Sequence, residues 1–290
     1  MANQSDSYKV GDSMVTRIFE KLISGFAPQA LFPAWNEERH ARQLPSICRD
    51  KTNQYLVMST HGWLVRTPHH NVLIDTGIGN YKNRKVPVFN RLNEPFLERL
   101  AACGMKPEDI DYVLLTHLHT DHVGWNTILK DGRWTATFPN AKYVFSKVED
   151  ALFSGPEGPK HPNYAFYEDS ILPVIKSGQA MMINGGGGEF MDGFFFHPTP
   201  GHSPDHLSIS LSSGGAKALF AGDVMHLPVQ VNFPDLSSSF SADPERGRIS
   251  RLWALEYAAQ NSALFFSSHC PDTSVGRIEQ KGVQFSWRFT

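Results

Sequence analysis

The residues best suited to chemistry lie together at the end of one apolar segment. Residues 112–116 have the character of a buried strand, and four polar side chains follow within six residues: His117, His119, Asp121 and His122. Two histidines at positions i and i+2 project from the same side of an extended chain, and the other two residues follow in the turn. Imidazole nitrogen and carboxylate oxygen are ligands of zinc and related metal ions. The spacing therefore predicts a metal site at the rim of a core.

The same spacing excludes other common kinds of metal site. A zinc-protease helix would carry its histidines at i and i+4 in an HExxH motif, which this chain lacks. Cys48, Cys103 and Cys270 are far apart in the sequence, which argues against a cysteine-rich structural zinc site. This one loop already offers three imidazoles and a carboxylate. One loop thus offers as many ligands as a closed zinc site needs, before the rest of the chain is counted, and this indicates two metal ions.

The pattern His117-x-His119-x-Asp121-His122 resembles the signature loop of the metallo-β-lactamase superfamily of hydrolases. The other motifs of that family occur in the expected order: Asp75-Thr76-Gly77 after an apolar segment, Thr199-Pro200-Gly201-His202-Ser203, Gly222-Asp223, and His269. The resemblance extends from about residue 55 to residue 269. It implies an α/β fold, a four-layer αββα sandwich with metals at one edge of the sheets, which agrees with the strand–helix–strand order of the sequence.

The resemblance also implies a role for each matched residue. His117, His119 and His202 would hold the first metal ion, Asp121, His122 and His269 the second, and Asp223 would bridge the two. Asp75 would hydrogen-bond a ligand histidine and fix its orientation, and His206 would support the site from behind the ligands. The donor set favours two zinc ions, although manganese, iron or cobalt can use the same nitrogen and oxygen ligands.

Such a site predicts hydrolysis without a serine or cysteine nucleophile. A hydroxide held between two divalent ions is nucleophilic at neutral pH, because metal binding lowers the pKa of water to about 7. It would attack a carbonyl carbon, and Asp121 could relay a proton to the leaving group. The predicted substrate is a small molecule with a lactone or carboxylic ester bond.

Two positions refine the choice of substrate. β-Lactamases of this fold carry cysteine or serine where Asp223 stands, whereas quorum-quenching lactonases carry aspartate. Those lactonases have a tyrosine three residues later, and here that position is His226, as in phosphotriesterase-like relatives. A histidine could donate a hydrogen bond to the substrate or accept a proton. Asp121, Asp223 and His226 are the catalytic candidates, and a phosphotriester hydrolase or a thioesterase is the alternative function.

Other members of the fold class fit the sequence less well. A flavodiiron-type redox protein would carry glutamate in place of His119. A processing nuclease would need a basic surface, and a non-catalytic sensor would lack some of the ligands.

Composition limits the partners. The 290 residues are 41% apolar, enough for a large core, and we expect a single domain over residues 1–290, with an N-terminal arm or wrapping segment (1–48) and a motif-bearing core (55–269). A net charge of −2 offers no attraction for nucleic acid or an anionic membrane. The basic cluster at residues 82–85 is interpreted as solvated loop surface.

No apolar run is long enough to cross a bilayer. Scattered cysteines favour the cytoplasm, and the aromatic N-terminal segment would suit a homodimer.

Periodicity and turn residues predict the elements around these motifs. We expect separate strands at 55–59, 63–66 and 72–75, a helix at 93–104, and a last strand at 264–267. Asp243 and Pro244 predict the start of a helix whose buried face carries Ile249, Leu252, Trp253 and Tyr257. Residues 1–15 are predicted to fray.

Overall fold

The computed structural model describes residues 6–290, which divide into two compact units. Unit 1 contains the described residues up to Lys21 together with Thr60–Gly185. Unit 2 contains Leu22–Ser59 and Gly186–Thr290. Each unit is assembled from two stretches that are distant in the sequence. The prediction of a single domain stays a prediction.

The first sheet has seven strands in the order β1-β2-β3-β4-β5-β8-β9. Their bounds are β1 Ser7–Val10, β2 Ser13–Phe26, β3 Leu56–Arg66, β4 Asn71–Ile74, β5 Tyr112–Leu114, β8 Lys142–Ser146 and β9 Ala180–Ile183. Strands β4, β5, β8 and β9 run parallel to one another, so the chain leaves them all at one edge. The first ligand loop begins at that edge, because it follows β5.

The second sheet also has seven strands, in the order β10-β11-β12-β13-β14-β15-β16. Their bounds are β10 Gly188–Glu189, β11 Phe194–Pro198, β12 Leu207–Ser213, β13 Ala216–Phe220, β14 Leu264–Phe266, β15 Val275–Lys281 and β16 Gln284–Phe289. Only β13 and β14 pair in parallel, and the remaining neighbours are antiparallel. A short hairpin, β6 Thr127–Lys130 and β7 Arg133–Ala136, forms a separate two-stranded sheet.

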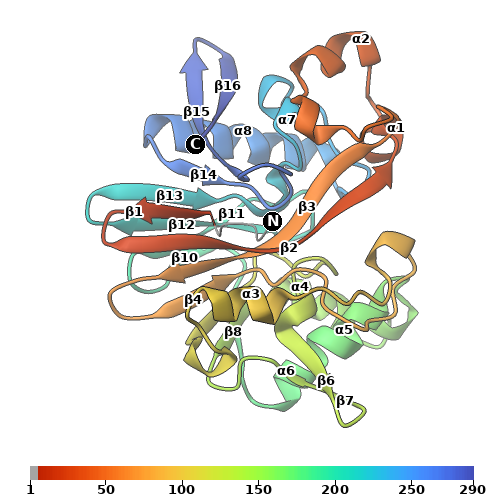
Figure 1. The fold of residues 1–290 in the computed structure, drawn as a ribbon, viewed down its shortest axis with the longest axis vertical. Helices are drawn as coiled ribbons and strands as arrows, with labels where there is room; N and C mark the ends of the chain where they lie inside the picture. Colours follow the sequence, from red (N-terminus) through yellow and green to blue (C-terminus); the bar gives the residue numbers. More distant parts are fainter. Residues whose placement is uncertain (1–5) are drawn as a thin grey trace. The chain divides into compact units, whose positions relative to one another are not determined.

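Helices fill the connections between the strands (Figure 1). The α-helices are α1 Pro28–Leu31, α2 Glu37–His40, α3 Phe96–Ala102, α4 Lys147–Ser154, α5 Tyr164–Ser170, α6 Leu172–Lys176, α7 Val229–Asn232 and α8 Pro244–Gln260. A 3₁₀ turn, η7, spans Gly222–Val224, and another, η2, spans Ser46–Cys48.

The core of unit 1 lies between its sheet and helices α3 to α6. Leu73, Val113 and Tyr143 from the strands pack with Phe96 and Phe166 from the helices, and all five are nearly inaccessible to solvent. Figure 1 shows these helices gathered beside β4 and β8. Burial of large apolar side chains contributes about 2 kcal/mol each, so this cluster fixes the frame that carries the first ligand loop.

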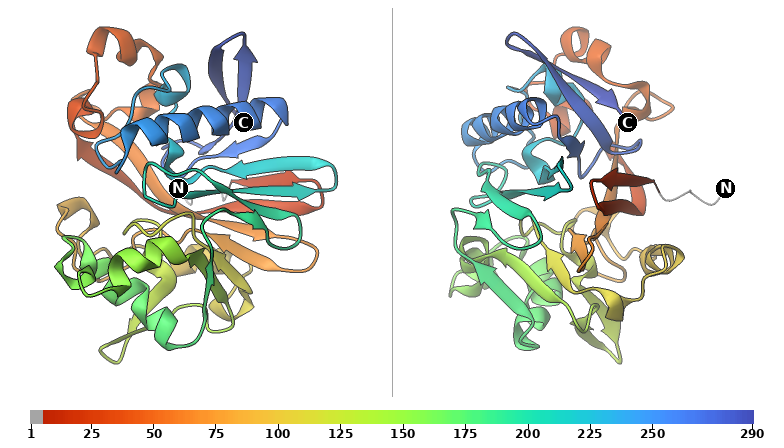
Figure 2. Two further views of the ribbon diagram at one scale, coloured as in Figure 1. Left: turned by 180° about the vertical axis from the view of Figure 1, so that it is seen from behind. Right: turned by 90° about the vertical axis from the view of Figure 1, so that its left-hand side faces the viewer.

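Unit 2 has two apolar clusters. In the first, α8 packs on β13, β14 and the C-terminal hairpin β15–β16, which lies beside α8 in Figure 2. In the second, Leu31, Phe32 and Cys48 pack against Leu227 and Leu236. The segment that the sequence assigned to an arm or wrapping role thus contributes buried side chains to the core of unit 2.

Several local predictions were wrong. Residues 7–10 and 13–26 form strands β1 and β2, so the described part of the segment predicted to fray is ordered in the sheet, while residues 1–5 lie outside the described residues. Strand β3 runs unbroken through Gly62, where two separate strands, at 55–59 and 63–66, were expected. A Cβ on that glycine would lie 2.5 Å from the carbonyl oxygen of Asp75, so glycine serves a close backbone approach within a strand.

The predicted helix at the end of the chain is present, but its buried face differs. Asp243 caps α8 by accepting from the backbone N–H of Arg246, as its position suggested. Ile249 is 56% exposed, whereas Arg251 and Leu255 are buried. The face was misassigned because the guanidinium of Arg251 is satisfied inside the protein by the carbonyls of Val224 and Pro234. Two strands also follow residue 267, so β14 is not the last strand.

Among residues 6–290, no helix combines the length and the apolar character needed to cross a bilayer.

Candidate metal centre

Asp75 and Thr116 meet because β4 and β5 are adjacent parallel strands that end at the same level. Ile74 pairs with Leu114, and the backbone N–H of Asp75 donates to the carbonyl of Leu114. The next residues of both strands therefore lie side by side. The Asp75 carboxylate accepts from the backbone N–H of Thr116 at 2.9 Å and from its hydroxyl at 2.8 Å. Asp75 itself has φ +53°, a left-handed conformation that aspartate tolerates better than most residues.

The same carboxylate orients the histidine at the end of the motif. Nδ1 of His122 lies 2.8 Å from Oδ2 of Asp75, and His122 is almost completely buried. A neutral imidazole that donates from Nδ1 carries its lone pair on Nε2. Asp75 thus holds His122 in the tautomer and orientation that a metal ligand needs, while the role of His122 as a ligand stays a prediction.

Thr116 extends this arrangement to His117. Its hydroxyl donates to Asp75 and lies 3.0 Å from Nδ1 of His117, so the imidazole donates to it from Nδ1. The rings of His117 and His122 have centroids 4.1 Å apart, and those of His117 and His119 are 4.5 Å apart. The loop therefore gathers three imidazoles, and His119 and Asp121 are partly accessible to solvent.

A buried glutamate that sequence reasoning missed supports the neighbouring loop. Glu20 of β2 accepts from the backbone N–H groups of Ile78 and Gly79, from the hydroxyl of Thr60 and from the indole of Trp125. Burial raises the pKa of this carboxyl, and its four donors oppose that shift. The available sequence signal was weak, because Glu20 is the only acidic residue of β2 but stands beside Lys21.

In unit 2, the parallel pair β13–β14 brings Asp223 and His269 to one edge, since each follows the end of its strand. Three imidazole Nε2 atoms surround the Asp223 carboxylate, at 3.2 Å for His202, 3.4 Å for His226 and 3.1 Å for His269. All four side chains are at least 95% buried. The sequence assigned His226 to catalysis, and the structure places it about as close to Asp223 as His202.

Backbone groups orient these donors. Nδ1 of His269 lies 2.9 Å from the carbonyl oxygen of Ser59, so it donates there and directs Nε2 toward Asp223. His206 accepts from the backbone N–H of Asp223 through Nε2, and its Nδ1 lies 2.8 Å from the hydroxyl of Thr199. His206 thus supports the turn that carries Asp223.

Longer-range contacts fix the turns that carry His202 and His226. The hydroxyl of Ser250 in α8 donates to the carbonyl of Pro200, and Gly201 lies so close to Gly247 that a Cβ would meet its nitrogen at 2.0 Å. The side-chain carbonyl of Gln230 accepts from the backbone N–H of His226 at 2.6 Å. The side chains of this cluster are therefore held by rigid elements on both sides.

The donor chemistry of both units fits divalent metal ions. Buried imidazoles that face one carboxylate through Nε2, with Nδ1 bonded to oxygen, form the carboxylate–histidine and carbonyl–histidine pairs found around bound metals. Within unit 2, His202, Asp223 and His226 lie close enough together to hold one ion. The structure thus fits the kind of site predicted, while the assignment of each ligand to a particular ion stays a prediction.

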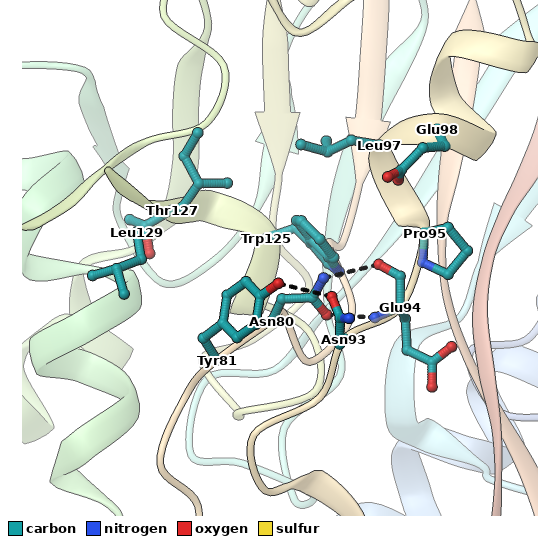
Figure 3. A pocket seen from close by; sticks show the side chains of 11 residues that line it. Asn80, Tyr81, Asn93, Glu94, Pro95, Leu97, Glu98, Trp125, Thr127 and Leu129 are labelled. Carbon is teal, nitrogen blue, oxygen red and sulfur yellow. Dashed lines mark hydrogen bonds between the residues drawn. The ribbon is translucent and has the colours of Figure 1, made fainter. Parts of the chain in front are cut away.

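One cavity, of about 380 Å³, lies in unit 1 (Figure 3). Trp125, Thr127 and Leu129 line one side of it, and Asn80 and Tyr81 line another. Amide groups brace its rim, because Asn80 exchanges two hydrogen bonds with the backbone of Glu94. None of the predicted site residues lines this cavity, so it is separate from the donors described above.

Comparisons with known proteins agree with this geometry. A profile of the metallo-β-lactamase superfamily matches residues 56–269. An uncharacterized protein of Bacillus subtilis, YobT, is 29% identical over 172 residues, which cover 57% of this chain and 61% of YobT. An N-acyl homoserine lactonase of Bacillus thuringiensis is 24% identical over 221 residues, 71% of this chain and 79% of that enzyme.

Solved structures extend the similarity to nearly the whole chain. The hydrolase AbOPH of the β-lactamase superfamily has a TM-score of 0.84 and 25% identity, covering 100% of this chain and 98% of its own. The dizinc quorum-quenching lactonase AidC has a TM-score of 0.77 and 24% identity, covering 99% and 97%. The predicted α/β fold class of the metallo-β-lactamase type is confirmed. With its motifs in order and the profile spanning most of its length, the chain belongs to the metallo-β-lactamase superfamily of hydrolases.

Proposed function

We propose that the protein is a metal-dependent hydrolase that cleaves a lactone or carboxylic ester bond. The observation that carries this proposal is the ring of three imidazole Nε2 atoms around the buried Asp223 carboxylate. Side chains of this kind are costly to bury unless they coordinate an ion or pair with one another, which favours a functional site over a structural one. The proposal keeps the seven ligands that the resemblance implies, with zinc as the favoured ion.

Two bound divalent ions would supply a nucleophile at neutral pH, by lowering the pKa of bound water to about 7, and would polarise the substrate carbonyl. The protein's own groups then have distinct tasks. Asp75, Thr116 and the carbonyl of Ser59 hold donor imidazoles in one tautomer, so the donors need little reorganisation during turnover.

Asp121 and His226 are the proposed proton carriers. Asp121 is partly exposed, so it can exchange a proton with solvent as well as with a leaving group. His226 is buried, and its backbone N–H is fixed by Gln230, so its imidazole has a defined place at the site. We propose that His226 donates a hydrogen bond to the substrate oxygen that gains negative charge.

Aspartate at position 223 and the likeness to N-acyl homoserine lactonases support lactones or esters as substrates. Histidine in place of the lactonase tyrosine supports the alternative, a phosphotriester substrate. The predicted homodimer and cytoplasmic location stay predictions.

A substrate panel tests the proposal directly. The purified protein, loaded with zinc, is assayed with an N-acyl homoserine lactone, an aryl ester, a thioester and a phosphotriester, with and without a chelator. We expect chelator-sensitive turnover of the lactone or ester. Turnover of the phosphotriester or thioester alone would replace this substrate class with the alternative, and no turnover by the zinc-loaded protein would contradict the proposal.

A further inference from the structure

A buried group of charged residues lies behind the first ligand loop. From the sequence, residues 82–85 were interpreted as solvated loop surface, and for Lys82 and Arg84 this is wrong. The Lys82 side chain is completely inaccessible, and that of Arg84 is 6% exposed. Both face Asp169 of α5, whose side chain is 11% exposed. Nothing in the local sequence signals this partner, which lies more than eighty residues away.

Asp169 holds the Arg84 guanidinium in a fixed plane. Two guanidinium nitrogens donate to its two carboxylate oxygens at 2.6 and 2.8 Å, a bidentate pair. The hydroxyl of Ser170 donates to the same carboxylate at 2.6 Å. Asp169 is itself firmly placed, because Phe166 and Tyr167 of the same helix belong to the core of unit 1.

The third guanidinium nitrogen reaches the ligand loop. Nε of Arg84 donates to the hydroxyl of Thr120 at 2.5 Å. Thr120 is the residue between His119 and Asp121, the two members of the loop whose side chains remain partly accessible. Since the guanidinium is rigid and planar, the position of Asp169 determines where Nε lies, and hence where Thr120 can be held.

This contact adds to other contacts that support the loop. Asp75 and Thr116 fix the imidazoles of His122 and His117, and Thr76 binds the carbonyl of His122 through its backbone N–H and its hydroxyl. Those contacts act on the two ends of the motif. The bond from Arg84 to Thr120 acts on its middle.

Stability alone is a weak reason for such a pair. Burying an ion pair costs desolvation that its Coulomb attraction roughly repays, so its net contribution to folding is small. Burial also lowers the pKa of Lys82 to about 7, so above neutral pH Arg84 is the cation that pairs with Asp169. A rigid ion pair that also hydrogen-bonds one loop residue is better suited to holding that residue in place than to stabilising the fold.

We infer that Arg84, held by Asp169, is a positioning residue that sets the geometry of His119 and Asp121 through Thr120 and thereby tunes the affinity of the loop for a divalent ion. The inference rests on the proposed function, because it assumes that the loop binds metal. It assigns no contact with the substrate to Arg84.

The test is a double-mutant cycle read out as metal affinity. The variants are Arg84→Met, Thr120→Val and the double variant, and zinc dissociation constants are measured by competition with a chromogenic chelator. Each single variant should weaken the more weakly bound zinc by about 10-fold, the usual loss when support of a ligand is removed. The double variant should lose no more than the worse single variant, because both break one contact.

Three further variants separate positioning from general stability. Thr120→Ser keeps the hydroxyl and should retain wild-type affinity. Arg84→Lys keeps the charge but lacks the planar fork, so its affinity should fall like that of Arg84→Met. Arg17→Met breaks an ion pair of 2.7 Å with Asp6, also in unit 1, and should leave zinc affinity unchanged.

Wild-type affinity in Thr120→Val, or additive losses in the double variant, would overturn the inference even if the native enzyme binds zinc and hydrolyses its substrate. An affinity loss in Arg84→Met that follows its loss of unfolding free energy, with Thr120→Val unchanged, would also overturn it. If the native protein itself bound no zinc and hydrolysed nothing, the proposed function would fail along with the inference.

Discussion

The two units present their donor residues in different ways. In unit 1 the donors come from six consecutive residues after one strand, and a side-chain carboxylate, Asp75, orients one of them directly. In unit 2 the donors follow three different strand ends, and their support acts through backbone groups: the carbonyl of Ser59 contacts the imidazole of His269, and the imidazole of His206 accepts from the N–H of Asp223. In unit 1 the orientation of the donors thus depends on a few side chains. In unit 2 it depends largely on backbone groups whose positions are set by the ends of the strands.

The largest effect is expected from replacing Asp223, whose carboxylate lies among three imidazoles of unit 2. Asp223→Asn keeps the shape of the side chain but removes the charge shared by three imidazoles. We expect the protein to lose one of two metal ions, and hydrolysis to fall by more than about 100-fold. Elemental analysis and steady-state kinetics measure both. Two tightly bound ions in this variant would show that Asp223 is not a shared ligand.

Replacing His226 should affect chemistry and not metal content. His226→Phe removes the proposed hydrogen bond to the substrate, so kcat should fall by about 100-fold while both metal ions remain bound. His197→Phe is a control, because His197 is another histidine of unit 2, and its Nε2 lies 2.8 Å from the hydroxyl of Ser210. A loss of metal in His226→Phe would instead make His226 a ligand.

Supports of the donors can be compared across the two units. Asp75→Asn weakens the contact with a donor imidazole and should lower metal affinity by about 10- to 100-fold. His206→Gln alters only the support of the Asp223 backbone and should cost less than about 10-fold. Calorimetric titration of the metal-free variants with zinc gives both values. If His206→Gln lowered metal affinity more than Asp75→Asn, the contrast between support of a donor side chain and support of a donor backbone would be contradicted.

The buried cations of the two units should affect the stability of the protein over different pH ranges. Burial lowers the pKa of Lys82 from 10.5 to about 7, and that of Arg251 in unit 2 from 12.5 to about 10. Between pH 7 and 10 the unfolded chain keeps a proton on Lys82 that the folded protein lacks, so stability should rise with pH by about 1.4 kcal/mol per unit. Below pH 7 the lysine is charged in both states, and the full cost of burying it is present.

Urea unfolding from pH 6 to 10 measures this effect. The difference in unfolding free energy between the native protein and Lys82→Met should change with that slope, whereas Lys85→Met, which alters an exposed lysine, should give no slope. Arg251→Met should destabilise the protein by the same amount at each pH up to about 9, below the lowered pKa of Arg251. A flat difference for Lys82→Met would show that Lys82 keeps its charge in the folded protein.

A structural feature could be predicted from the sequence when the residues that form it are close together in the chain. The ligand loop is contiguous, so residue types and spacing alone indicated metal binding at His117–His122. Asp223 and His269 are distant in sequence, and only the resemblance to a family joined them to that loop. Parallel pairing of β13 with β14, which places these two residues together, has no signature within either segment.

Several of the wrong predictions share one physical cause. Lys82, Arg84 and Arg251 are charged residues whose burial depends on partners far along the chain, and local patterns assign such residues to the surface. The exposed Ile249 on α8 is the counterpart, since the buried Arg251 lies on the opposite side of the helix from the face that periodicity gave to apolar residues. Gly62 was placed between two strands and not within one, because the close approach of Asp75 cannot be read from its neighbours.

The most direct measurement is the number of zinc ions per chain, determined by elemental analysis after the protein has been stripped with chelator and reconstituted, with lactone and ester turnover followed on the same sample. A dinuclear hydrolase predicts two ions per chain and activity that returns in proportion to the second ion. One ion or none, with no hydrolysis after reconstitution, would contradict it.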